Sequence, residues 1–102
     1  MANDKLAYLE ELLLNDEGLL ISLRLGNGLN MEKIDLICGI LKELSDEWKK
    51  DDVIPKKAAN LFVDFYQAIE SSCGLYNDEK QIQIMNAADK IMDLIRECVE
   101  IN

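Results

Sequence analysis

The chain has very little material for turns. It contains one proline and five glycines among its 102 residues, and these are the residue types that most readily reverse a chain. Many short strands would need frequent turns, so the sequence favours a few long elements. Its composition, 49% hydrophobic and 30% charged, is typical of globular proteins. A single domain over residues 1–102 with one core is therefore expected.

Apolar residues recur every three or four positions, which predicts amphipathic helices. Asn3 or Asp4 can cap the first helix, Asn30 a later one and Asn77 the last. The apolar stripes are Leu6, Leu9, Leu12 and Leu13; Met31, Ile34, Ile37, Leu41, Leu44 and Trp48; and Ile84, Ala88, Ile91, Ile95 and Cys98, widened by Ile82, Met85, Met92 and Val99.

Short polar or glycine-containing stretches separate these segments. "NDEG" at 15–18 either divides residues 4–25 into two helices, with Asn15 or Asp16 capping the second, or lies within one long helix. "GNG" at 26–28 is expected to end that region because glycine tolerates positive φ. Gly74 is expected to act as a left-handed stop in the same way.

The helix that follows Pro55 is the least polar part of the chain. Proline fits a first helical turn, and the helix is expected to extend to about Ser72. Its polar residues Asn60, Asp64, Gln67 and Ser71 form one narrow stripe, and apolar residues fill most of the remaining circumference. Such a helix must be covered on several sides, so it is predicted to be the central helix.

Four or five helices with short connections favour antiparallel neighbours. The predicted fold class is therefore all-α, an up-and-down antiparallel helical bundle. Tyr8 and Tyr76 lie near predicted helix ends, and each fits either the edge of the bundle or an interface.

Charge indicates the kind of partner. Twenty acidic residues against eleven basic ones give a net charge of -9. Such a surface repels nucleic acid and attracts a basic protein, although a modest negative charge also serves solubility alone. Cys38, Cys73 and Cys98 lie among apolar residues without a CxxC spacing, which indicates buried, reduced thiols in a cytoplasmic protein. The acidic start is not expected to be a signal peptide, and no apolar run is long enough to span a bilayer.

The chain lacks most of the residues that catalysis and cofactor binding usually require. The chain contains no histidine, which is the commonest general base and zinc ligand. Neither a phosphate-binding glycine loop nor a complete calcium loop is present. We therefore expect no catalytic residues, no cofactor and no metal. A carboxylate enzyme or metal carrier is the class that ranks last.

Carboxylates remain as candidate contact residues. Asp89, Asp93, Glu97 and Glu100 are spaced by four, four and three along the last helix. Side chains at these spacings share one face. A solvated face is the default interpretation, and Asp89, Asp93 and Glu97 are the second choice for a partner-binding surface.

The first choice lies in "DEWKKDD" at 46–52. Asp46, Glu47, Asp51 and Asp52 surround Trp48 at a predicted corner between helices. A tryptophan beside charged residues is a common interface anchor. Trp48 also continues the apolar stripe of its helix, so the core is its default position.

In size, helix layout and the "VIP" at 53–55 before an apolar helix, the chain resembles the small helical immunity proteins that bacteria pair with secreted toxins, bacteriocins among them. The resemblance implies binding without catalysis, through an acidic surface that covers a toxin, often a basic nuclease. No site residue is transferred from that family. The alternative is a helical adaptor or regulator that acts as a homodimer through excess apolar surface.

Overall fold

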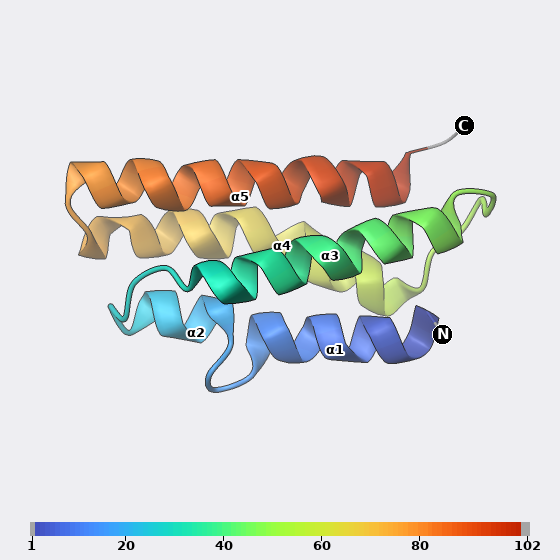
Figure 1. Cartoon of the computed structure of the whole chain (residues 1–102), viewed down its shortest axis with the longest axis horizontal. Coiled ribbons are helices and arrows are strands. Elements are labelled where there is room, and N and C mark those ends of the chain that lie inside the picture. Colours follow the sequence, from blue (N-terminus) through green and yellow to red (C-terminus); the bar gives the residue numbers. More distant parts are fainter. Residues whose placement is uncertain (1, 101–102) are drawn as a thin grey trace.

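The structure, a computed structural model, describes residues 2–100, with side chains from residue 4 onward. Within that range the chain is all-helical and forms no strand (Figure 1). None of these helices is long and apolar enough to cross a membrane. The elements are α1 (Ala2–Leu14), α2 (Leu19–Arg24), α3 (Met31–Trp48), α4 (Lys56–Ser72), the short 3-10 helix η1 (Cys73–Leu75) and α5 (Asp78–Val99). The predicted all-α class is confirmed.

The helices lie along one long axis in a molecule of 42 × 25 × 21 Å. Figure 1 shows α1 and α2 running one way, α3 returning, α4 running with α1, and α5 running with α3. The largest helix interface joins α3 and α5, which are parallel and are not consecutive in sequence. α1 packs on α3, and α4 packs on α5 and α2. α3 and α4, which a short connection joins, run in opposite directions in Figure 1 but make few close backbone contacts.

One hydrophobic core runs between the helices. The apolar stripes predicted for the first, third and last helices are buried almost throughout. Three of the predicted residues are exposed instead, namely Met31, Ile82 and Val99. Met31 lies in the first turn of α3 and Val99 in the last turn of α5.

The prediction that the proline-led helix is central is wrong. α4 does extend to Ser72, as expected, and its stripe of Asn60, Asp64, Gln67 and Ser71 is exposed. However, Val63 is 77% exposed, because only α5 and α2 pack closely on α4. The apolar flank of α4 thus continues onto the surface, and α4 is not covered on all sides.

"NDEG" divides the N-terminal region into two helices. Gly18 is the N-cap residue of α2, and no side chain caps this helix, so the capping role expected for Asn15 or Asp16 is wrong. Asn15 Oδ1 instead accepts a hydrogen bond from the Glu17 amide at 3.4 Å. Asp4 lies inside the first turn of α1 rather than before it, and the Asn3 side chain lies outside the described side chains.

Gly18 is required by close packing of the backbone, not by its torsion angles. A Cβ atom at this position would lie 2.9 Å from the Asn15 carbonyl oxygen and 3.0 Å from the Asn15 nitrogen. Gly39, which lies within α3, has open space around it. The two glycines therefore allow a matched test.

We expect Gly18→Ala to destabilise the fold and Gly39→Ala to stabilise it. The first change forces the α1–α2 connection apart, and the cost is on the order of 1–3 kcal/mol. The second adds helix propensity in an exposed helix interior, worth about 0.5–1 kcal/mol. Urea unfolding followed by circular dichroism measures both. Equal shifts in the same direction would show that the connection does not depend on Gly18.

The remaining connections follow the sequence signals in part. Asn30 and Asn77 cap α3 and α5 by accepting hydrogen bonds from the Lys33 and Lys80 amides at 3.1 and 2.9 Å. Gly26 and Gly28 have φ values of 79° and 86°, as expected of "GNG". The left-handed stop expected at Gly74 is wrong, because the chain continues there in η1 and Gly74 does not have a positive φ.

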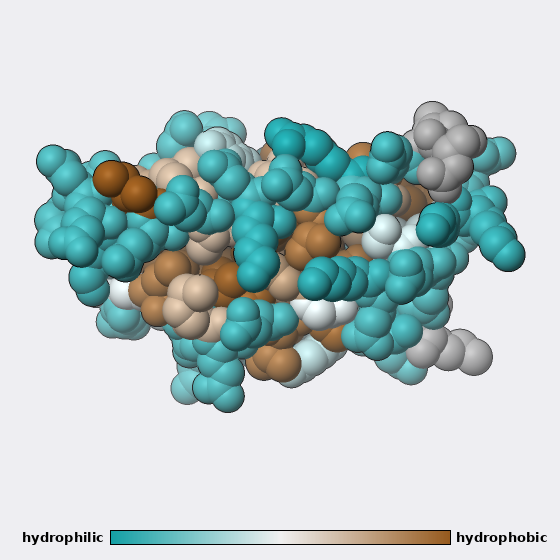
Figure 2. All heavy atoms as spheres, turned by 45° about the horizontal axis from the view of Figure 1, so that its top comes forward, coloured by the Kyte–Doolittle hydropathy of each residue, from teal (hydrophilic) through white to brown (hydrophobic). Residues whose placement is uncertain are grey.

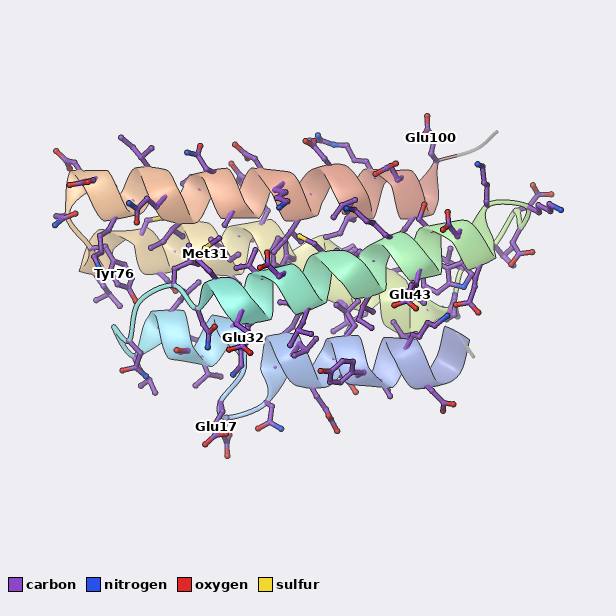
Figure 3. The ribbon with its side chains drawn as sticks, in the orientation of Figure 1. Glu17, Met31, Glu32, Glu43, Tyr76 and Glu100 are labelled. Atoms are coloured by element: carbon purple, nitrogen blue, oxygen red, sulfur yellow. The ribbon has the colours of Figure 1, made fainter. Side chains whose placement is uncertain are left out.

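Tyr76 joins two connections at one end of the molecule. Its hydroxyl donates to the Leu23 carbonyl at 2.8 Å and accepts from the Gly28 amide at 3.1 Å. Figure 3 shows the ring where the α4–α5 connection meets the loop that precedes α3. Tyr76 therefore holds the end of α2 and the "GNG" loop against the start of α5.

Tyr76→Phe is expected to lower the free energy of unfolding by about 1–3 kcal/mol. The change keeps the ring but leaves a partly buried amide and carbonyl without their partner, and each lost hydrogen bond costs about 0.5–1.5 kcal/mol. Tyr8→Phe is the control, because Tyr8 is exposed. Chemical denaturation of both variants decides the matter. A Tyr76→Phe protein as stable as the Tyr8→Phe protein would contradict the role of the hydroxyl.

Candidate functional site

The predicted corner combines an exposed charged surface with a buried tryptophan. Asp46 and Glu47 lie near the end of α3, and Asp51 and Asp52 lie in the connection to α4; all four are exposed. Trp48 is only 6% exposed and belongs to the core. The core interpretation of Trp48 is confirmed, and its indole is not available as a surface anchor.

The corner is also nearly neutral. Residues 42–57 contain five carboxylates and five lysines. Lys5 Nζ lies 2.9 Å from Glu47 Oε2 and 3.9 Å from Glu43 Oε1, and the hydrogen bond to Glu47 is the main reason why the pKa of Lys5 is raised. A basic partner therefore meets little net field at this corner.

The second predicted surface, on α5, is exposed as expected. Asp89, Asp93 and Glu97 all face solvent, and Arg96 Nη1 lies 3.1 Å from Asp93 Oδ1. Because α3 and α5 are parallel, Glu97 near the end of α5 lies at the same end of the molecule as the corner (Figure 1). Asp89, in the middle of α5, lies farther from the corner. The two predicted surfaces are thus brought to one end only in part.

Asp89 also lies close to the hydroxyl of Tyr66 on α4. Burial raises the pKa of Tyr66 first, and the nearby charges of Asp89 and Glu70 raise it further. In the described residues no three carboxylates or thiols are grouped so that they could hold a metal ion. The α5 surface is therefore an array of separate charges.

The excess of negative charge lies elsewhere. Residues 6–23 and residues 58–79 contain eight carboxylates and no lysine or arginine. The carboxylates are Glu10, Glu11, Asp16 and Glu17 in the first segment, and Asp64, Glu70, Asp78 and Glu79 in the second. The two segments are neighbours, since α2 packs on α4 and Lys57 Nζ lies 2.9 Å from Glu10 Oε1. We call this region the acidic side; the residues that border it, Arg24 and Lys57, are cations.

A groove runs along the acidic side between α2 and α4. Its narrower part has a volume of about 200 Å³ and apolar walls, which include Leu13, Leu14, Leu20, Ile21, Leu61 and Ala68. Its wider part, about 500 Å³, is lined by Gln67, Ser71, Ser72 and Leu75. Arg24, Asp64 and Ala68 line both parts, so the two are adjacent. We call the whole the α2–α4 groove.

Arg24 and Asp64 are the charged residues of the α2–α4 groove. Both are exposed, and within residues 4–100 neither forms an ion pair within 4.0 Å. Arg24 is the last residue of α2, and Asp64 belongs to the exposed stripe of α4. Both charges are thus open to a ligand in the groove.

A second apolar surface lies between α3 and α5. Figure 2 shows apolar side chains along this seam between rows of hydrophilic ones. Met31 and Leu29 face Ala87 and Lys90 across a depression of about 490 Å³. Met31 is 55% exposed. We call this surface the α3–α5 seam.

The three cysteines are buried and free, as expected. Burial raises the pKa of each thiol, and it raises that of Cys98 to about 11. Cys98 Sγ donates to the Leu41 carbonyl at 3.4 Å. Because the thiolate is the nucleophilic form, these residues are poor nucleophiles near neutral pH.

Stability is expected to fall between pH 9 and pH 11, partly through Cys98. Below the ordinary value of 9.0 the thiol is protonated in both the folded and unfolded chain. Above it the unfolded chain loses the proton while the folded chain keeps it, which costs about 1.4 kcal/mol per pH unit. Urea titrations at pH 8.5 and pH 11 should show a smaller loss for Cys98→Ala than for the parent. Equal losses would contradict this source.

The sequence contained a signal for the groove that helix periodicity does not reveal. The absence of lysine and arginine over residues 6–23 and 58–79 is visible in the sequence, but only the packing of α2 on α4 brings the two segments together. Arg24 and the α2–α4 groove were therefore not among the predicted site residues. Comparisons of the chain with protein-family models, curated proteins and solved structures find no match.

Proposed function

We propose that this protein is a non-catalytic binding protein that associates with a basic protein partner through its acidic surface. Among such proteins, an immunity protein that neutralises a cognate bacterial toxin, for example a basic nuclease, agrees best with the sequence resemblance. In this proposal the partner supplies the chemistry, and the protein supplies a rigid surface of opposite charge.

The observation that carries the proposal is the uneven distribution of charge. Eight carboxylates without a single lysine or arginine lie on two segments that pack side by side. Fields from such a region reach about 8 Å at physiological salt. They accelerate encounter with a basic protein and disfavour acidic ones.

The proposed function also requires a stable helical frame and a suitable cellular compartment. The alternating course of the helices in Figure 1 supports an up-and-down antiparallel bundle as the rigid frame, although its closest pair, α3 and α5, is parallel. Three free, buried cysteines support a reducing compartment such as the cytoplasm. A rigid binder loses little entropy on association, which favours tight binding.

The test is capture of the partner from the native cell at low salt. We expect one basic protein to be retained and then released when the salt concentration is raised, because salt screens the ion pairs between the two proteins. The purified partner should inhibit growth of cells that lack the protein, and expression of the protein should restore growth. An acidic partner, or retention that salt does not affect, would contradict the proposal.

The α3–α5 seam favours a second candidate function, that of a homodimeric adaptor. Its exposed Met31 and the neighbouring Leu29 belong to an apolar surface of the kind that a second copy covers in some helical proteins. Light scattering after size-exclusion chromatography distinguishes the two. The proposed function predicts a mass near 11.6 kDa at all concentrations, and twice that mass would favour the adaptor.

A further inference from the structure

We infer that the partner contributes a basic amphipathic helix, and that this helix docks in the α2–α4 groove. The inference rests on the proposed function and adds which surface binds and what binds there. Its occupant is one helix with apolar residues on one face and lysine or arginine beside them.

The size of the groove suits a short helix. Its α4 wall extends from Asn60 to Ser72, which corresponds to about 18 Å at 1.5 Å per residue, or roughly three helical turns. The opposite wall consists of the end of α1 and the whole of α2. Two helices as walls and a third laid between them is a common mode of peptide recognition.

The break at "NDEG" accounts for the groove. α1 packs on α3, whereas α2 packs on α4, so the two helices cover different parts of the molecule. α2 has only six residues and covers about 9 Å of α4. The remaining length of this face of α4 has no helix over it within the described residues.

The apolar side chains of the groove are positioned to bind such a helix. Leu14 is 49% exposed at one end and Leu75 is 59% exposed at the other. Between them, Leu61 and Ala68 lie on the wall formed by α4. Spacings of three, four and seven along the incoming helix would place its apolar side chains against these residues.

The charged residues in and near the groove determine which charge a bound helix should carry. Asp64 lies in the groove without an ion pair. Asp16 and Glu17 are exposed in the connection between α1 and α2, the two helices that form the opposite wall. Figure 3 shows Glu17 directed outward from this connection. Arg24 is the one cation that lines the groove in the described chain. It therefore favours a neutral or acidic residue of the helix at that point and sets the direction of binding.

A second copy of this chain is a poor occupant. It carries a net charge of -9, so two copies repel each other. Residues 6–23 and 58–79 of that copy contain no lysine or arginine that could face Asp64. A helix from a basic protein has neither disadvantage.

The test uses a synthetic probe, a helical peptide of about 14 residues built from leucine, lysine and alanine with one leucine stripe. The full chain, labelled with ¹⁵N, is titrated with this peptide and amide shifts are recorded. We expect saturable shifts confined to α2, the end of α1 and residues 60–75. The same peptide with glutamate in place of lysine should bind at least tenfold more weakly.

Matched variants separate the groove from the rest of the surface. Leu14→Ser is expected to weaken binding about five- to tenfold, whereas Leu36→Ser, at a leucine of α3 with 43% exposure, should leave it unchanged. Asp64→Lys should weaken binding at least tenfold, and Asp35→Lys, which changes the net charge equally, should weaken it less than threefold. Thermal unfolding of each variant verifies that it is folded.

The possible outcomes distinguish this inference from the proposed function. Saturable shifts at residues 46–52 or along the α3–α5 seam would overturn the groove as the site and leave binding of a basic partner intact. Equal binding of the lysine and glutamate peptides would overturn both. Shifts in the groove that depend on protein concentration without peptide would identify a second copy as the occupant and would also overturn the inference.

Discussion

Replacing Trp48 with alanine is expected to destabilise the protein by about 3–5 kcal/mol, because truncating a buried aromatic residue removes apolar contacts and leaves a cavity. Trp48 is 6% exposed, and the partly buried Ile54 packs against the same core. A domain of this size is stable by about 5–15 kcal/mol. The loss therefore takes a large share of the total and lowers Tm by on the order of 20 °C.

Urea unfolding followed by circular dichroism measures this loss, with Tyr8→Ala as the control for an exposed aromatic residue. Tyr8→Ala is expected to cost less than about 1 kcal/mol. Trp48 is the only tryptophan, so the parent's fluorescence should be blue-shifted relative to the unfolded chain. If Trp48→Ala were as stable as Tyr8→Ala, Trp48 would lie at the surface and would again be a candidate anchor.

Reversing the two carboxylates at "NDEG" is expected to weaken binding of the captured partner by at least tenfold. In Asp16→Lys with Glu17→Lys, two exposed acidic residues beside the α2–α4 groove become basic, which removes attraction and adds repulsion to a basic protein. Isothermal titration of the purified partner at low and physiological salt measures the effect. The difference between parent and variant should shrink as salt increases.

The control is the same change at the predicted corner, Asp51→Lys with Asp52→Lys. Both pairs are adjacent, exposed and outside helices, so both variants alter net charge equally. We expect the corner variant to weaken binding less than threefold, because five lysines already surround these residues in the segment 42–57. If the corner variant weakened binding more than the Asp16→Lys, Glu17→Lys variant, the binding site would lie at "DEWKKDD" instead.

The helices were predictable because their signals are local. Asn30 and Asn77 accept hydrogen bonds from amides three residues later, a geometry that depends on a few neighbouring residues. The stripe from Ile34 to Leu44 is buried because spacings of three and four place side chains on one face. The choice between one helix and two at residues 4–25 needed the structure, since it depends on how closely Gly18 approaches Asn15.

The position of α4 was not predictable from its own residues. Its apolar circumference predicted burial on several sides, yet Val63 is 77% exposed. Which sides of a helix are covered depends on the lengths and directions of the other helices. Here the short α2 and the parallel pairing of α3 with α5 leave one flank of α4 open.

The candidate site was predictable only as a type of surface. Net charge predicts an acidic surface. The segment "DEWKKDD" was predicted as the site because it contains Trp48, but Trp48 lies in the core. The α2–α4 groove depends on segments that are about 40 residues or more apart in sequence and meet through packing. Arg24 and Asp64, for example, line the same groove without any sequence motif that links them.

Amide hydrogen exchange of the full chain, free and in complex with the captured basic partner, tests the central claim most directly. Buried interfaces protect backbone amides, so the bound surface is read residue by residue. The account predicts new protection over α2, the end of α1 and residues 60–75. Protection confined to residues 46–52, to the exposed face of α5 or to the α3–α5 seam would contradict it.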